Sequence, residues 1–135
     1  MLATKKYFSL EEANSLLPRI SKILIQIMKI NNDINVLNSV TIDYEDEIKA
    51  IKNDIRMNKN FHRLYYNLYK KIELLIDMGC IVKDADLGVV DFYSMYEGEE
   101  IFLCYKLGEK EIRYWHYPEE GYAGRRSVSE LKKEN

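Results

Sequence analysis

The chain has 135 residues, of which 47% are hydrophobic and 31% are charged, and its formal net charge is −2. This size and composition predict one globular domain spanning residues 1–135. The slightly acidic balance argues against a general nucleic-acid-binding protein, since such proteins carry a clear basic excess. We find neither an apolar run of about 18 residues, which a membrane span requires, nor a signal-peptide pattern at the start, and therefore expect a protein without a membrane partner.

The first half of the chain predicts a long antiparallel helical hairpin over residues 8–79. Ser9 and Glu12 match the S-x-x-E capping box that begins helices. Pro18 removes one backbone hydrogen bond inside the first helix, so we expect a kink or a short break near residues 14–18. Apolar residues repeat along this helix at alternating spacings of three and four, which is typical of a heptad seam. They are Ala13, Leu16, Ile20, Ile23, Ile27, Ile30, Ile34 and Leu37.

The second helix is expected from about Tyr44 to Met78 and ends before Gly79, a residue type common just beyond helix ends. Its predicted seam consists of Tyr44, Ile48, Ile51, Ile55, Asn58, His62, Tyr65, Tyr69, Ile72 and Ile76. A second stripe widens the apolar face in the second half and consists of Met57, Phe61, Leu64, Leu68 and Leu75. Two helices alone cannot cover faces this wide, so we expect a homodimer in which two hairpins form a four-helix arrangement.

After Gly79 the apolar period changes to two, which predicts a small antiparallel sheet of three to four strands within residues 80–128. The expected strands are 80–84, 89–93, 101–106 and 112–117, and a loop rich in glycine and arginine follows them. The fold class is therefore α+β, with the helical hairpin preceding the sheet.

We expect residues 107–111 to form the loop between the last two strands. The bounds of this loop determine which residues pair across the two strands. In this register Lys106 faces Ile112, and side chains alternate between the two faces of the sheet. One face is polar and reactive, with Phe102, Cys104, Lys106, Ile112, Tyr114 and His116. The other face is expected to be core, with Ile101, Leu103, Tyr105, Arg113, Trp115 and Tyr117.

Several of these segments together resemble the family catalogued as domain of unknown function 2203. The matching segments are FSLEEANSLLP at 8–18, GCIVKD at 79–84, GVVDF at 88–92, LCYKLGE at 103–109, YWH at 114–116 and GYAGRR at 121–126. Two positions depart from the pattern: Tyr105 stands where similar sequences tend to have tryptophan, and Ser127 where they often have proline. The resemblance implies a shared fold and a set of candidate residues, and it implies no activity.

Three residues are candidates for catalysis. His116 could act as a general base or a metal ligand, or it could be a strand histidine bonded to a neighbour. Cys104 could be a nucleophile if Lys106 lowers its pKa, or it could be a small core residue. Asp91 lies in an apolar strand and needs a partner, which we expect to be Arg125 in a structural ion pair unless Asp91 serves a site.

Four residues are candidates for holding an anionic ligand: Arg125, Arg126, Lys106 and Tyr114. The guanidinium group suits phosphate or carboxylate. The alternative is that the arginines form salt bridges, or that one of them stacks on Trp115 or Tyr122. Glu109 is expected to accept backbone hydrogen bonds in its tight turn.

A metal site is a further alternative, with His116, Glu120 and Asp91 as candidate ligands, although two neighbouring ligands need a third. No motif indicates a cofactor. Two cysteines, Cys80 and Cys104, are too few for a disulfide framework and indicate a reducing cytoplasm, while a single bond between them is the alternative.

These observations favour an uncharacterised cytoplasmic protein that serves as a dimeric binding or scaffold module. Its polar face would recognise an anionic small molecule or a protein partner. The alternative is a small enzyme resembling a hydrolase or lyase, with His116 as acid–base and with or without a metal. The sequence leaves open whether there is catalysis at all.

Overall fold

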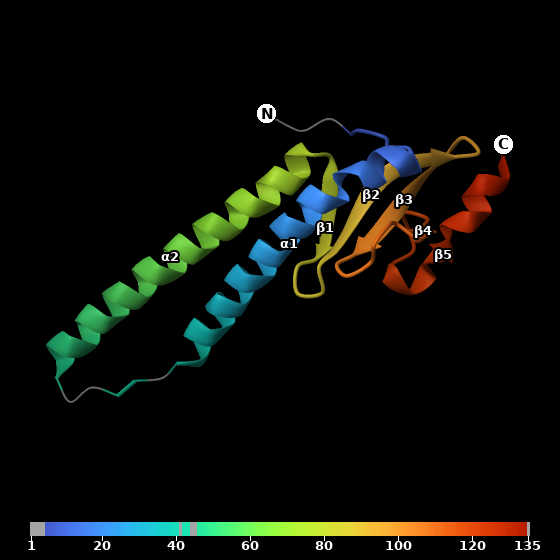
Figure 1. Ribbon diagram of the computed structural model, residues 1–135. Helices are drawn as coiled ribbons and strands as arrows, with labels where there is room; N and C mark the ends of the chain where they lie inside the picture. Colours follow the sequence, from blue (N-terminus) through green and yellow to red (C-terminus); the bar gives the residue numbers. More distant parts are fainter. Residues whose placement is uncertain (1–4, 41, 44–45, 135) are drawn as a thin grey trace.

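The structure, a computed structural model, describes residues 5–40, 42–43 and 46–134. Helix α1 spans Leu10–Ser39 and helix α2 spans Glu47–Asp77. The two helices run antiparallel as a hairpin that extends well beyond the sheet (Figure 1). No helix in the described ranges is long and apolar enough to cross a membrane.

The ends of both helices follow local chemistry. The Ser9 side chain accepts a hydrogen bond from the Glu12 backbone N–H, and the Glu12 carboxylate accepts one from the Ser9 N–H, which confirms the capping box. Helix α1 continues through Pro18 without a break. Helix α2 begins after Asp46, whose side chain accepts from the Ile48 N–H, and it ends before Gly79, whose φ is +97°.

The sheet has five antiparallel strands in the order β1-β2-β3-β4-β5, one or two more strands than expected. The strands are β1 (Cys80–Asp84), β2 (Val89–Tyr96), β3 (Glu99–Lys106), β4 (Tyr114–His116) and β5 (Arg126–Ser127). A 3-10 helix over Val128–Glu134 follows β5. The additional strand β5 is only two residues long, so it lacks an alternating pattern that sequence reasoning could detect.

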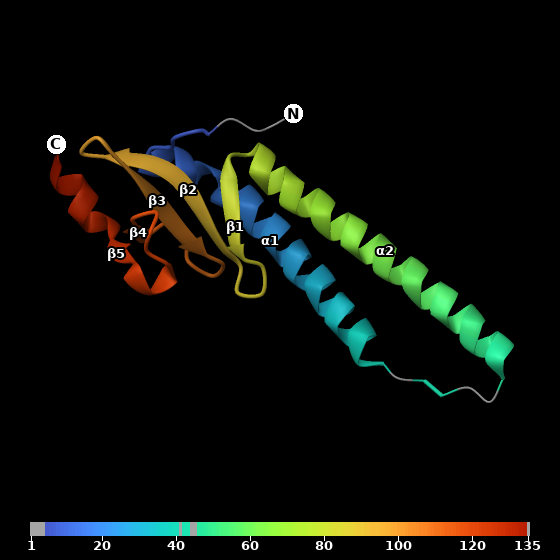
Figure 2. The same cartoon turned by 180° about the vertical axis from the view of Figure 1, so that it is seen from behind.

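Helix α1 lies against one face of the sheet (Figures 1 and 2), and the hydrophobic core lies between them. The fully buried Leu24 and Ile20 of α1 belong to the same core cluster as Phe92 and Leu103 of the central strands. Trp115 is also in this cluster, as expected for the apolar face of the sheet. The opposite face carries Asp91, Cys104 and His116 and is therefore free to form a site.

The register between β3 and β4 is the expected one, with Phe102 opposite His116 and Cys104 opposite Tyr114. The expected start of the last strand is wrong, however, because β4 begins at Tyr114 instead of residue 112. Ile112 leaves the ladder, its N–H donates to the Asn14 side chain on α1 at 2.7 Å, and it is buried in the core. Arg113 is consequently exposed and does not face the core.

The predicted seam of α2 is only partly correct: Ile72 packs against the core, but the second stripe faces inward along most of the helix, and Tyr44 lies outside the described residues. Leu68 and Leu75 are buried, and Phe61 and Leu64 pack against the core. The predicted seam residues Ile48, Ile51 and Ile55 are 64%, 58% and 51% exposed. Both stripes have helical spacing, so only the packing of α1 and α2 could decide which one turns inward.

Candidate functional site

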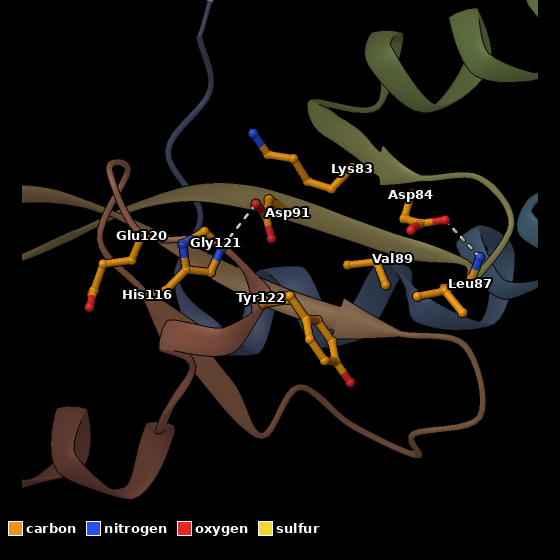
Figure 3. A pocket seen from close by; sticks show the side chains of 10 residues that line it. Lys83, Asp84, Leu87, Val89, Asp91, His116, Glu120, Gly121 and Tyr122 are labelled. Carbon is orange, nitrogen blue, oxygen red and sulfur yellow. Dashed lines mark hydrogen bonds and ion pairs between the residues drawn. The ribbon is translucent and has the colours of Figure 1, made fainter.

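The candidate site lies on the face of the sheet opposite α1. Asp91 on β2 pairs directly with Cys104 on β3, so their side chains project from the same face. His116 on β4 lies opposite Phe102 of β3, two residues along from Cys104, and reaches toward Asp91 across β3. Figure 3 shows His116 and Asp91 pointing toward one another, with the chain at Glu120–Tyr122 passing over them.

Asp91 and His116 form a buried pair, with exposures of 1% and 3%. The His116 Nε2 atom lies 3.0 Å from Asp91 Oδ2, and His116 Nδ1 lies 2.8 Å from the Tyr117 carbonyl oxygen. A carbonyl oxygen only accepts, so Nδ1 carries a proton and Nε2 is directed at Asp91. Burial lowers the pKa of His116, but hydrogen bonds to Asp91 and the Tyr117 carbonyl, together with the charge of Asp91, outweigh it and raise this pKa overall.

One carboxylate oxygen of Asp91 accepts no hydrogen bond from the described residues. Its Oδ1 atom is buried and has no hydrogen-bond partner among the described residues. Leaving a charged acceptor buried without a partner costs on the order of several kcal/mol, so such an oxygen in a folded protein calls for an explanation. The expected ion pair between Asp91 and Arg125 is wrong, because Asp91 bonds His116 and Arg125 bonds a different carboxylate.

Cys104 lies beside this pair as a free, buried thiol. Burial, and secondarily the negative charge of Asp91, raises the pKa of Cys104 to about 12. The thiolate is therefore scarce at neutral pH, and Lys106, the expected activator, instead lies over the Tyr122 ring at 5.9 Å. Cys80 is also free and projects from the opposite face of the sheet, so the two thiols are not disulfide-bonded.

A cavity of about 320 Å³ opens over the Asp91–His116 pair (Figure 3). The lining residues come from the β1–β2 hairpin, the three central strands and the segment after β4; they are Lys83, Asp84, Leu87, Val89, Asp91, Cys104, His116, Glu120, Gly121 and Tyr122. Sequence reasoning missed six of these lining residues as site residues: Lys83, Asp84, Leu87, Val89, Gly121 and Tyr122. Alternation from Asp91 already places Val89 on the same face, whereas Lys83 and Asp84 depend on the irregular register of β1 and the remaining residues on the paths of the loops.

Arg125 does not line this cavity; its Nη2 pairs with Glu109, its guanidinium group stacks on two tyrosine rings, and its Nε is buried without a hydrogen-bond partner among the described residues. Its guanidinium carbon is 4.0 Å from the ring centroid of Tyr114 and 4.5 Å from that of Tyr122. Its Nη2 donates to both oxygens of Glu109 at 2.9 and 3.1 Å. Glu109 also accepts from the Lys106 N–H at 2.6 Å, which confirms its expected role in the turn. This cluster matches the structural alternative of salt bridges and stacking.

Arg126 is engaged in a similar but more exposed way. It pairs with Glu120 at 3.3 Å and lies over Trp115 and Tyr117 at 5.5 and 5.2 Å. Glu120 also accepts from the Tyr117 N–H, and these bonds together hold the pKa of Glu120 below its ordinary value. The carboxylate of Glu120 is therefore occupied by bonds to Tyr117 and Arg126 within the bend that covers the cavity.

Three side chains could together hold a metal ion: Asp91, Cys104 and His116. Their ligand atoms lie within 4.8 Å of one another, and all three residues are buried. Two of the expected metal ligands, His116 and Asp91, therefore lie together, and Cys104 instead of Glu120 supplies the third group.

A family model described as "Uncharacterized conserved protein (DUF2203)" matches residues 6–128 of the chain. This range includes both helices, all five strands and every residue of the cavity. Comparisons with curated proteins and with solved structures found no match. Because the family model spans nearly the whole chain, this protein belongs to the uncharacterised conserved family DUF2203.

Proposed function

We propose that this protein is a binding module that holds a small organic acid in the cavity over the Asp91–His116 pair. The observation that carries the proposal is the unpartnered Oδ1 of Asp91 beneath a cavity of about 320 Å³. That volume lies at the lower end of the range for small-molecule sites. A hydroxyl or amino group of the ligand would donate a hydrogen bond to Oδ1. This bond would remove the free-energy cost of leaving the oxygen buried without a partner.

The charges around the cavity favour an anionic group on the same ligand. Lys83 forms no ion pair with any described residue and lies over the Phe102 ring at 5.2 Å. Arg126 neutralises the negative charge of Glu120. The proton that Asp91 shares with His116 neutralises the negative charge of Asp91. The side chains of Leu87 and Val89 form an apolar part of the cavity wall. The preferred ligand is therefore a small hydroxy or amino acid with an apolar body.

A thermal-shift panel of hydroxy acids, amino acids and sugar phosphates tests this proposal. At a concentration 100 times Kd, a ligand stabilises the folded state by about 2.7 kcal/mol, which is readily measured as a rise in Tm. Lys83→Met should abolish the rise in Tm. Lys22→Met, a matched change at an exposed position of α1, should leave it intact. Absence of a shift with every compound, or equal shifts in both variants, would overturn the proposal.

The module acts as a homodimer in this proposal, with a second copy covering the exposed stripe of α2. This outer stripe comprises Ile48, Ile51, Ile55, Tyr65, Tyr69 and Ile76, with exposures of 64%, 58%, 51%, 38%, 63% and 44%. Contiguous exposed apolar surface of this kind is typical of interaction sites. With Asn58, His62 and Ile72 at the intervening positions, these residues repeat at spacings of three and four, which suits packing against an identical helix across a two-fold axis.

The cytoplasm is the location that fits best with two free, buried thiols. A small enzyme resembling a hydrolase or lyase is the second candidate, because the Asp91–His116 pair faces the cavity and its histidine pKa is raised. Turnover that is lost in His116→Gln while the ligand-induced rise in Tm persists would favour the enzyme. Ligand binding without turnover would favour the binding module.

A further inference from the structure

We propose that Asp91, Cys104 and His116 form a site for a divalent transition metal, with Zn²⁺ the best fit, at the floor of the cavity. This inference goes beyond the ligand-binding proposal and stands without it, because metal binding is measured with no organic ligand present. It rests on the donor set, the spacing of the ligand atoms, the orientation of the histidine and the unpartnered carboxylate oxygen.

The donor set selects the class of metal. One carboxylate oxygen, one sulfur and one imidazole nitrogen suit zinc, which binds all three types. Calcium and magnesium prefer oxygen ligands alone, so sulfur and nitrogen make them poor candidates. Three protein ligands next to a cavity correspond to an open site, in which the fourth position is left for water or another small molecule.

The spacing of the ligand atoms suits such an ion with small movements. All three lie within 4.8 Å of one another, and His116 Nε2 is 3.0 Å from Asp91 Oδ2. Bond lengths to zinc of about 2.0–2.3 Å place ligand atoms roughly 3.3–3.8 Å apart in a tetrahedron. The His–Asp distance must therefore open by a few tenths of an ångström, and Cys104 must approach by up to about 1 Å.

The surroundings of the ligands are already arranged for metal binding. The Tyr117 carbonyl oxygen accepts from His116 Nδ1 at 2.8 Å, which fixes the ring so that Nε2 faces the cluster. Metal-binding histidines are held in this way by a carbonyl or carboxylate on their other nitrogen. The Oδ1 of Asp91, buried and without a described partner, provides a second carboxylate oxygen at the same place.

Binding forms three bonds to the metal, from a carboxylate oxygen of Asp91, the Sγ of Cys104 and the Nε2 of His116. The proton shared by Asp91 and His116 and the thiol proton of Cys104 leave to the solvent. The carboxylate and thiolate then carry two negative charges, which balance the ion. This balance explains how an acid and a thiol can share one buried site.

Titration of tag-free, chelator-treated full-length protein with Co²⁺ and then Zn²⁺ tests the site. One Co²⁺ per chain should bind and produce the thiolate-to-cobalt charge-transfer absorption, and Zn²⁺ should displace it. Cys104→Ser should remove the charge-transfer band and weaken Zn²⁺ binding by more than the roughly 10–100-fold that loss of an outer-shell partner costs. The matched control is Cys80→Ser, because Cys80 is equally buried on the opposite face of the sheet.

Circular dichroism of each variant separates loss of the site from loss of the fold, and His116→Gln provides a second ligand variant if Cys104→Ser is unfolded. The inference is overturned if no metal binds in stoichiometric amounts, or if Cys104→Ser binds as wild type does. Repeating the organic-acid panel with chelator and with Zn²⁺ distinguishes the two proposals. Metal binding without a thermal shift from any organic acid would contradict only the ligand proposal. A thermal shift from an organic acid without metal binding would contradict only the metal site.

Discussion

Arg125 and Arg126 are neighbours in the chain but differ in how far their ion pairs are shielded from water. The side chains of Arg125 and Glu109 are 10% and 18% exposed, whereas those of Arg126 and Glu120 are 45% and 29% exposed. Arg125 is also held between two tyrosine rings. Shielded pairs resist screening, and removing one partner leaves the other charge uncompensated. The burial of each arginine therefore decides whether it supports the fold.

Arg125→Met should lower the free energy of unfolding by about 3 kcal/mol, because Glu109 is left half-buried without its partner. Arg126→Met, the matched control, should cost no more than about 1 kcal/mol, since its pair is largely solvated. Urea denaturation of both variants measures these values. Equal losses in the two variants would contradict this account of the arginine cluster.

At the scale of the element, the N-terminal end of α1 combines a capping box with a link to the sheet. The hydrogen bonds of Ser9 hold the pKa of Glu12 below its ordinary value. One turn later, Asn14 accepts the Ile112 N–H that has left the β-ladder. The start of α1 therefore contributes both to helix formation and to the position of the segment that leads into β4.

Glu12→Gln should make stability less dependent on pH in acid. Because the pKa of Glu12 is lower in the folded state, the folded state binds this proton more weakly than the unfolded state. The stabilisation is complete above the unfolded pKa of about 4.3 and is lost as pH falls through the folded value. Urea denaturation at pH values from about 6 to 3 should show a smaller loss in Glu12→Gln than in wild type. Glu11→Gln, in the same helical turn, should behave as wild type does.

Gly79 follows the C-cap of α2 and also fits closely against Phe8, two residues before the start of α1. A Cβ at Gly79 would lie 2.8 Å from the Phe8 ring, and its φ of +97° disfavours other residues. Gly108 has a φ of +105° with nothing within 4 Å, so Gly108→Ala measures the backbone cost alone. Gly79→Ala should be less stable than Gly108→Ala by about 1–3 kcal/mol, the cost of overpacking. Similar denaturation midpoints for the two variants would show that Phe8 gives way without cost.

At the scale of the whole molecule, the hairpin extends beyond the sheet that covers its base (Figure 1). The sheet and the second stripe of α2 bury the apolar face of α1, including Ile20, Leu24 and Ile27, which are 0% exposed. Nothing in the described chain covers the outer stripe of α2. The dimer proposal supplies that cover from an identical surface, which a two-fold axis requires.

Ile51→Glu should convert a dimer to a monomer, because it places a charge at the centre of an apolar contact. The control is Met95→Glu on β2, a change at a side chain of similar exposure, 50%, that lies outside the hairpin. Sedimentation equilibrium should give a dimer for wild type and Met95→Glu and a monomer for Ile51→Glu. A monomeric wild-type protein at about 100 µM would rule out this dimer and leave the stripe to a different partner.

Local patterns were sufficient to predict most of the secondary structure and the residue types of the site. The capping box at Ser9, the end of α2 at Gly79 and the pairing of Cys104 with Tyr114 depend on neighbouring residues and on loop length. Local signals of this kind act whatever the rest of the chain does. They also placed Asp91 and His116 among the candidates.

Only the tertiary structure decided which groups meet. Asp91 pairs with His116 instead of Arg125, because strand order brings β4 within reach of β2 while the irregular segment after β4 carries Arg125 toward Glu109. The choice between the two stripes of α2 likewise followed from packing against α1. By itself the sequence determined the helices, the strands and the chemistry of the side chains available. The juxtaposition of Asp91, Cys104 and His116 required the sheet, because contacts between distant residues depend on how whole elements pack.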